Sequence, residues 1–210
     1  MVEETFGFFD NKRTGGYDMK IVCMGDSLTY GYGVRHQDSW IRLVRDMKPE
    51  YMILNRGIPG DTTGGMLSRF ETDVLANEPD LVFLMGGTND IFFAESIIPA
   101  RSNIAAMVSI CMARNIKMIL GIPIPICREA LTDEWRYYAE LPNTQKLYDE
   151  LTGWIEKYGK QFVIPILAME KILPDDETRR KECYLDGVHL NEKGNRLMAE
   201  YFVSQISDME

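Results

Sequence analysis

Short runs of consecutive apolar residues, each ended by glycine or by small polar residues, recur along this 210-residue chain. Ile21 to Met24 is one such run and stops at Gly25, and Leu81 to Met85 is another. A strand of a parallel sheet that is buried on both faces has this kind of sequence. We expect five such strands. They cover about residues 20–25, 51–54, 81–85, 116–122 and 162–167.

The segments between these runs carry apolar residues at helical spacing. We expect helices over about residues 36–47, 66–75, 100–113 and 144–158, and a final helix capped by Asn191. Alternating strands and helices predict an α/β fold, a doubly wound (flavodoxin-like) five-stranded parallel sheet with helices on both faces. The length fits a single domain over residues 19–210, preceded by an N-terminal extension over residues 1–18.

Composition narrows the class of partner and cofactor. The net charge of −9 argues against nucleic acid as a partner, and no apolar segment reaches the ~18 residues of an integral membrane segment. Two histidines and four cysteines without CxxC spacing predict no metal site. Gly31 and Gly33 do not complete a dinucleotide fingerprint. The N-terminus lacks the features of a secretory signal, so the sequence predicts a cytoplasmic protein.

Polar residues follow several of the predicted strands, where parallel sheets bind their ligands. Ser27 follows the first strand, and His189 lies three residues after Asp186 near the end of the chain. A serine nucleophile needs a base, and the base needs an acceptor that holds its tautomer. The alternative for Ser27 is a helix cap or a turn residue, and His36 is interpreted as a polar residue at a helix end.

Acyl transfer also needs donors directed at the developing oxyanion. The candidates are the backbone N–H of Ser27, the backbone N–H of Gly57 or Gly60, and the side-chain amide of Asn89. The residues alone do not choose between the two glycines. The alternative for each glycine is a turn, and for Asn89 a turn or a helix cap.

Four short blocks together resemble the SGNH (GDSL) hydrolase family, most closely its thioesterase/lysophospholipase-like esterase branch. They are GDSLT at 25–29, NRGIPGDTT at 55–63, GGTND at 86–90 and DGVHLN at 186–191. The resemblance implies that Ser27 is the nucleophile, His189 the base and Asp186 the residue that orients it.

The same resemblance implies an oxyanion hole made by the Ser27 and Gly60 backbones and the Asn89 side chain. It places Asp26 and Asp90 at positions with a structural role. It also implies a serine esterase of the lipase/acylhydrolase type that needs no metal or cofactor and cleaves small-molecule esters or thioesters through an acyl-enzyme. The alternatives are a carbohydrate O-acetylesterase and a non-catalytic binding module on the same fold.

Residues 126–143 form the longest connection without a clear helical stripe, and we expect them to be irregular or to contain a short helix. Long loops of this kind in compact domains usually carry function. Trp135, Tyr137 and Tyr138 in this segment are candidate substrate-binding residues that supply an apolar wall for an acyl or alcohol group. The alternative is that they pack beneath the loop as a small satellite core.

Overall fold

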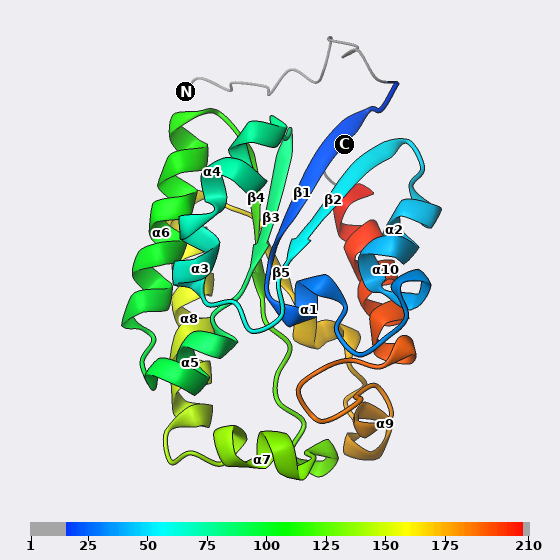
Figure 1. Ribbon diagram of the computed structural model, residues 1–210, viewed down its shortest axis with the longest axis vertical. Coiled ribbons are helices and arrows are strands. Elements are labelled where there is room, and N and C mark those ends of the chain that lie inside the picture. The colour runs from blue at the N-terminus through cyan, green and yellow to red at the C-terminus, as the bar shows by residue number, and fades with distance from the viewer. Residues whose placement is uncertain (1–15, 208–210) are drawn as a thin grey trace, which may run out of the picture.

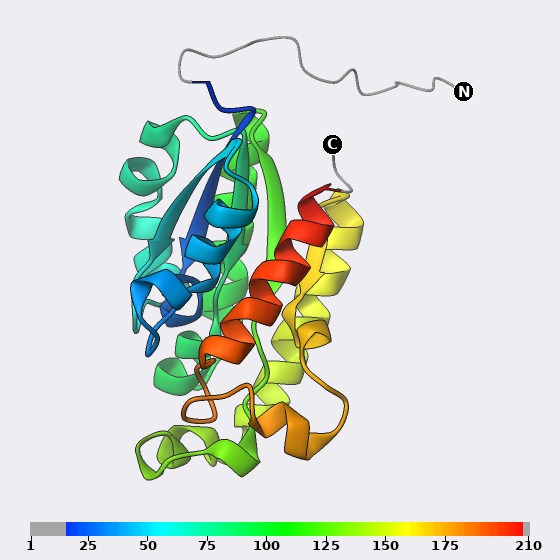
Figure 2. The same ribbon diagram turned by 90° about the vertical axis from the view of Figure 1, so that its right-hand side faces the viewer.

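The computed structural model describes residues 16–207 of the chain and has one parallel sheet between two layers of helices (Figures 1 and 2). The strand order is β2-β1-β3-β4-β5, and every pair is parallel. The strands are β1 (Met19–Gly25), β2 (Tyr51–Gly57), β3 (Leu81–Met85), β4 (Lys117–Ile122) and β5 (Ile166–Ala168). This arrangement confirms the predicted doubly wound α/β fold.

Ten α-helices lie within the described residues. They are α1 (Ser27–Tyr30), α2 (Trp40–Met47), α3 (Thr63–Ser68), α4 (Phe70–Asp73), α5 (Thr88–Ala94), α6 (Ile98–Ala113), α7 (Asp133–Ala139), α8 (Thr144–Phe162), α9 (Glu177–Lys181) and α10 (Glu192–Ser207). Asn191 caps α10, as predicted: its side-chain oxygen accepts from the backbone N–H groups of Lys193 and Gly194 at 3.0 and 3.2 Å.

The apolar strands bury side chains on both faces of the sheet, because successive residues of a strand point to opposite sides. Ile21 belongs to the core beneath α2 and α10, and the next residue, Val22, belongs to the core beneath α3, α6 and α8. Figure 1 shows these two groups of helices on opposite sides of the sheet. In the first core, Trp40, Phe83 and Phe202 pack edge to face with ring centroids 5.2–5.8 Å apart.

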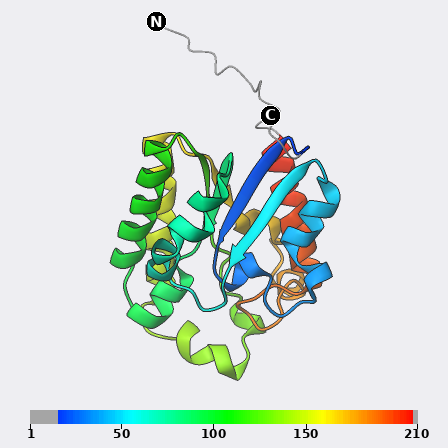
Figure 3. The ribbon, with the colours of Figure 1, turned by 45° about the horizontal axis from the view of Figure 1, so that its top comes forward.

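The carboxyl ends of β1, β2 and β3 are level with one another. Gly25, the last residue of β1, pairs with Gly57 and with Met85, the last residues of its two neighbours. The loops that follow these strands therefore start along one edge of the sheet, the edge at which α1 and α5 begin. The same edge is visible with the top of the molecule turned forward in Figure 3.

The predicted fifth strand at 162–167 is wrong at its beginning. Helix α8 continues to Phe162 and ends at Val163, whose φ of 56° is left-handed, so β5 starts only at Ile166. The helix is extended by a stack of aromatic rings spaced four residues apart. Tyr158 lies 4.7 Å from the ring of Trp154 and 4.6 Å from the ring of Phe162. The apolar residues at 162–167 fit a strand by composition, and the ring contacts that keep Phe162 in the helix are not evident from that run alone.

Three further segments differ in detail from the expected elements. The helix expected at 66–75 starts earlier, at Thr63, because the Thr62 side chain caps α3 by accepting from the N–H of Gly65. It is divided into α3 and α4 at Arg69. The helix expected at 36–47 begins as a 3-10 turn over His36–Asp38 before α2. The polar residues after β3 form the helix α5, which the sequence patterns did not predict. Segment 126–143 contains the short helix α7.

Most of the predicted N-terminal extension, residues 1–15, lies outside the described residues, so its separation from a domain at 19–210 stays a prediction. Residue 19 begins β1. Within residues 16–207, none of the helices combines the length and the apolar character that crossing a bilayer requires.

Candidate active site

Ser27 is the first residue of α1 and follows the carboxyl end of β1. The preceding residue, Asp26, is the helix cap, because its Oδ1 accepts a hydrogen bond of 2.9 Å from the N–H of Leu28. The alternative role of a capping residue therefore belongs to Asp26 and not to Ser27. The turn needs glycine at position 25, since a Cβ there would lie 2.0 Å from Thr29 Oγ1. This turn leaves the hydroxyl of Ser27 at the edge of the sheet.

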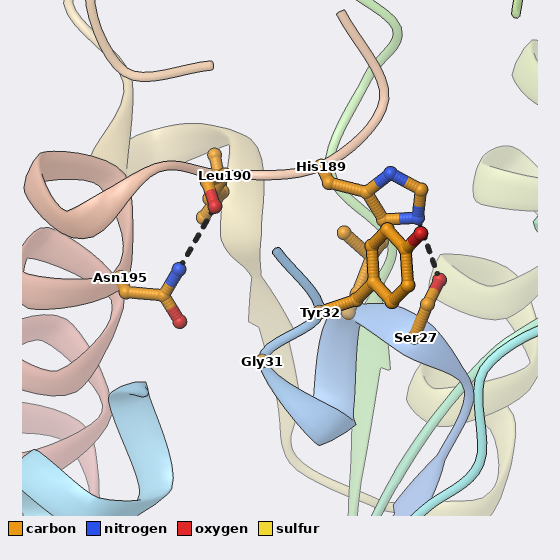
Figure 4. Close-up of a pocket in the computed structure, with 7 residues that line it drawn as sticks. Ser27, Gly31, Tyr32, His189, Leu190 and Asn195 are labelled. Atoms are coloured by element: carbon orange, nitrogen blue, oxygen red, sulfur yellow. Dashed lines mark hydrogen bonds between the residues drawn. The ribbon is translucent and has the colours of Figure 1, made fainter. Parts of the chain in front are cut away.

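His189 and Asp186 lie on the loop between α9 and α10 and meet Ser27 across the end of the sheet. His189 Nε2 lies 3.0 Å from Ser27 Oγ, and His189 Nδ1 lies 2.7 Å from Asp186 Oδ2. Figure 4 shows the hydrogen bond between His189 and Ser27. The carboxylate assigns the proton to Nδ1, which leaves the Nε2 lone pair to accept from the Ser27 hydroxyl.

The Asp186 carboxylate is held in its charged form by several donors. Its Oδ1 accepts from the backbone N–H groups of Val188 and His189 at 3.0 and 2.7 Å. Burial opposes its ionisation, but the hydrogen bonds from the His189 ring and from these two N–H groups outweigh burial and lower the pKa of Asp186. A charged acceptor thus faces the ring nitrogen that does not contact Ser27.

The structure separates the two candidate glycines after β2. The N–H of Gly57 already donates to Asn55 Oδ1 at 2.9 Å, and a Cβ on Gly57 would lie 2.2 Å from the backbone nitrogen of Tyr30. Gly57 is therefore a close-packing residue. Gly60 has a left-handed φ of 79° and open space around its Cβ position, so of the two it is the one with a backbone that remains accessible.

Asn89 lies in the first turn of α5, next to the loop that carries Gly60. Its Nδ2 donates to the carbonyl oxygen of Asp61 at 2.8 Å, which leaves the second N–H of the amide for another acceptor. Arg69 holds the same loop by donating to Asp61 Oδ2 at 2.9 Å and to the carbonyl oxygen of Gly25 at 3.1 Å. The loop, Asn89 and the end of β1 are thus tied together.

Asp90 and Asp26 are buried carboxyls that hold the backbone around the site. Asp90 accepts from the N–H of Thr63 at 2.9 Å and from its hydroxyl at 2.6 Å, and burial raises the pKa of Asp90. Burial also raises the pKa of Asp26 to about 7, although the N–H of Leu28 lowers it. Both carboxyls accept from backbone N–H groups at the edge of the sheet, Asp26 within its own turn and Asp90 from the start of α3.

The three aromatic residues of α7 take different positions. The ring of Trp135 packs edge to face on His189, with centroids 5.1 Å apart. Tyr138 packs on Phe92 at 5.8 Å within a small apolar cluster beside the site. Tyr137 is 71% exposed and contacts the ring of Tyr138. Trp135 therefore contacts both His189 and the cluster, and a role of these three residues in binding substrate stays a prediction.

Tyr32 is a residue at the site that the sequence analysis missed. Its ring centroid lies 4.7 Å from that of His189, and the two residues line a small cavity together with Ser27 (Figure 4). The available signal was its position between Gly31 and Gly33, which directly follow the serine turn. By contrast, His36 is exposed in the 3-10 turn and is not among the residues that meet Ser27.

The described residues offer a hydrogen-bonded serine, histidine and aspartate but no grouping of metal ligands. Among residues 16–207, no three histidine, cysteine, aspartate or glutamate side chains gather as a bound metal ion would require. What these residues bring together is a serine hydroxyl, an imidazole and a carboxylate in hydrogen-bonding sequence, with N–H donors on the adjacent loops. Such an arrangement can deprotonate the serine and stabilise a negative oxygen.

Comparison with known proteins identifies the family to which the chain is similar. Residues 23–197 match the GDSL-like Lipase/Acylhydrolase family. The chain is 33% identical over 214 residues to the uncharacterized lipoprotein YqeF of Bacillus subtilis (strain 168), with 88% of each protein covered. It is 35% identical over 97 residues to an arylesterase of Vibrio mimicus, covering 43% of this chain and 48% of that protein.

The fold is also similar to that of solved structures. A putative lipolytic protein of the G-D-S-L family from Desulfitobacterium hafniense DCB-2 aligns with a TM-score of 0.76 and 25% identity, covering 89% of this chain and 99% of that one. The expectation of a cytoplasmic location gains no support from these comparisons, because the Bacillus subtilis relative is described as a lipoprotein. That location stays a prediction.

Proposed function

Because this chain belongs to the GDSL-like lipase/acylhydrolase family, we propose that it is a metal-independent serine esterase acting through a Ser27–His189–Asp186 triad. Its substrates are small-molecule carboxylic esters or thioesters. The observation that carries the proposal is the continuous hydrogen-bond chain from Ser27 Oγ through both ring nitrogens of His189 to Asp186 Oδ2, with distances of 3.0 and 2.7 Å. These distances lie within the normal hydrogen-bond range.

The proposed reaction proceeds in two halves. Ser27 Oγ attacks the ester carbonyl while His189 Nε2 takes its proton, and Asp186 stabilises the imidazolium that forms. His189 then gives this proton to the leaving oxygen as the ester C–O bond breaks and an acyl-Ser27 ester remains. In the second half a water molecule loses a proton to His189, attacks the acyl carbon, and releases the acid as Ser27 regains its proton.

The negative oxygen of each tetrahedral intermediate needs donors that are already in place. We assign this role to the backbone N–H groups of Ser27 and Gly60 and to the free N–H of the Asn89 side chain. The ties from Asn89 and Arg69 to Asp61 support this assignment, because they fix the loop of Gly60 relative to the serine turn. Fixed donors need no reorganisation when the charge develops.

The reaction can be tested with a fluorophosphonate probe and p-nitrophenyl acetate, both in the presence of EDTA. We expect the probe to label Ser27 covalently and the ester to be hydrolysed at the same rate with and without the chelator, because His189 and Asp186 activate the serine. Activity that EDTA removes and a metal restores would contradict the proposal. An intact protein that neither reacts with the probe nor hydrolyses esters would instead be a binding module.

We also propose that the aromatic residues Trp135, Tyr137 and Tyr138 contribute a substrate wall, with Trp135 as its central member. The contact of Trp135 with His189 at 5.1 Å and its packing on Phe92 at 6.1 Å support this role. Phe92 belongs to α5, the helix that also carries Asn89. Trp135 thus contacts the base on one side and the helix of an oxyanion donor on the other.

Replacing Trp135 by alanine distinguishes a role in the substrate wall from a role in the apolar core. For a wall, we expect a changed KM and a shifted preference along a series of p-nitrophenyl acyl esters, with little change in the rate on acetate. A core residue would cost roughly 3–5 kcal/mol of unfolding free energy and lower all substrates equally. Melting curves beside the acyl-length series decide between them, and the exposed neighbour Glu134→Ala is the matched control. A large loss of stability with an unchanged profile would refute the wall.

A further inference from the structure

Tyr32 packs against the imidazole of His189 and lies directly after the serine turn. The two ring planes are inclined by 49° with centroids 4.7 Å apart, and Tyr32 is 45% exposed. In the part of the chain that the structure describes, the Tyr32 hydroxyl has no hydrogen-bond partner. Figure 4 shows the phenol ring standing beside both His189 and Ser27. An exposed aromatic face therefore adjoins the two residues that exchange the proton.

The backbone holds Tyr32 firmly in this place. Its N–H donates to the carbonyl oxygen of Ser27 at 3.0 Å, and it stands between two glycines with left-handed φ values of 82° and 86°. A Cβ on Gly33 would lie 2.3 Å from Leu185, which shows how closely the loop packs against the segment before Asp186. Tyr32 is thus positioned by the same elements that position the triad.

The site has two distinct sides. Of the proposed oxyanion donors, Gly60 lies on the loop that leads into α3 and Asn89 lies in the first turn of α5, on the side of the helices that cover one face of the sheet (Figure 1). Tyr32 and His189 lie on the connections to α2 and α10, which cover the other face. Ser27 lies between the two sides. A carbonyl whose oxygen faces Gly60 and Asn89 must present its remaining groups elsewhere.

The chemistry of the triad decides which group lies beside Tyr32. During acylation the proton on His189 Nε2 passes to the ester oxygen that leaves, so that oxygen must lie within hydrogen-bond reach of the imidazole. The alcohol attached to it then lies next to the side chains that pack on the imidazole. Tyr32 is one of these side chains, at a centroid distance from His189 that is characteristic of direct ring contact; the other ring on His189, that of Trp135, comes from α7.

We propose that Tyr32 determines specificity for the leaving group and favours alcohols that carry a ring, aryl or glycosyl, over linear alcohols. The inference rests on the proposed esterase function and assigns a subsite within it. The flat apolar face of such a ring packs on the phenol face, and the free Tyr32 hydroxyl can bond a hydroxyl of a sugar. The acyl group makes no contact with Tyr32.

The test compares acetates of phenol, of a methyl glycoside and of ethanol, so that the acyl group stays constant. For Tyr32→Ala we expect kcat/KM to fall about tenfold more for the ring-bearing acetates than for ethyl acetate, the size of one lost pocket contact. Tyr32→Phe should keep the preference for phenyl acetate. If Tyr32→Phe loses kcat/KM on the glycosyl acetate alone, the preferred leaving group is a sugar. If it keeps kcat/KM on both ring-bearing acetates, the preferred leaving group is an aryl alcohol.

A second measurement separates leaving-group contact from mere support of His189. Every acetate forms the same acetyl-Ser27, so its hydrolysis, followed after the burst of p-nitrophenol, should proceed in Tyr32→Ala at the wild-type rate. A residue that only supports His189 would slow both halves alike, because the imidazole acts in both. Equal slowing of both halves, or equal losses on linear and ring-bearing acetates, would overturn the proposal.

Tyr30→Ala is the matched control, because Tyr30 is a neighbouring half-exposed tyrosine without a ring contact to His189 among the described residues. We expect it to keep the wild-type order of substrates. Failure of this inference is distinguishable from failure of the esterase function. An enzyme whose hydrolysis depends on Ser27 but whose substrate order ignores Tyr32 refutes only the subsite, whereas hydrolysis that survives Ser27→Ala refutes the triad.

Discussion

Replacing Ser27 by alanine is expected to lower kcat by a factor on the order of 10⁶, since the members of a catalytic triad act as a unit. The hydroxyl at 3.0 Å from His189 Nε2 supplies the nucleophile, and no other group in the proposed mechanism replaces it. The fold should change little, because Asp26 caps α1 and remains in place. The lost hydrogen bond contributes about 1 kcal/mol.

The measurement is steady-state hydrolysis of p-nitrophenyl acetate together with a melting curve. Ser68→Ala is a suitable control, because Ser68 is an exposed serine whose hydroxyl bonds the carbonyl oxygen of Gly65 in its own helix. It should retain full activity. Near-wild-type hydrolysis by folded Ser27→Ala would remove Ser27 from the mechanism and with it the role of the whole triad.

Replacing Asn89 by alanine should lower kcat by roughly 10²–10³ and change KM much less. The reason is that the charged oxygen exists in the transition state and the intermediate, not in the bound ester. The variant also loses the hydrogen bond from Asn89 to the carbonyl oxygen of Asp61, which helps to hold the loop of Gly60. Part of the loss in kcat would therefore come from a displaced backbone N–H of Gly60, the neighbouring oxyanion donor.

Asn103→Ala controls for this loosening of the loop. Asn103 donates its amide to Thr63 Oγ1 at 3.1 Å, directly after the same loop, but it has no role in the proposed reaction. We expect this variant to keep most of its kcat, which would assign the larger loss in Asn89→Ala to the oxyanion. A raised KM with unchanged kcat in Asn89→Ala would identify Asn89 as a residue that binds the ground state.

Two alternatives to a general esterase remain to be tested in this family member, a carbohydrate O-acetylesterase and a non-catalytic binding module. A carbohydrate O-acetylesterase would use the same triad, and it would cleave acetylated sugars but not longer acyl esters. A binding module would keep the geometry without turnover. The glycosyl arm of the Tyr32 experiment and the acyl-length series of the Trp135 experiment therefore also measure how narrow the activity is.

The alternation of strands and helices along the chain could be predicted because it depends on local sequence patterns. An uninterrupted apolar run such as Leu81 to Met85 can be satisfied only where both faces are covered, so the strand and its central place follow from the residues. The end of α8 could not be predicted in this way. Phe162 and Val163 are as apolar as a strand, but the ring stack on Tyr158 keeps Phe162 in the helix and the left-handed turn at Val163 ends it.

The nucleophile, the base and the orienting acid could be proposed from residue types and from the resemblance of short blocks. The choice between Gly57 and Gly60 by geometry needed the tertiary structure. Gly57 packs against the backbone of Tyr30 and uses its N–H on Asn55, and neither contact is visible in the local sequence.

The chain itself determined which chemical groups are present and at which strand ends they lie, because strand ends and turns depend on neighbouring residues. Only the tertiary structure decided which distant groups meet. His189 reaches Ser27 across 162 positions of sequence, and Tyr32 becomes part of the site because its ring packs on that of His189. Contacts of this kind depend on how the helices pack on the two faces of the sheet, and that packing is a property of the whole core.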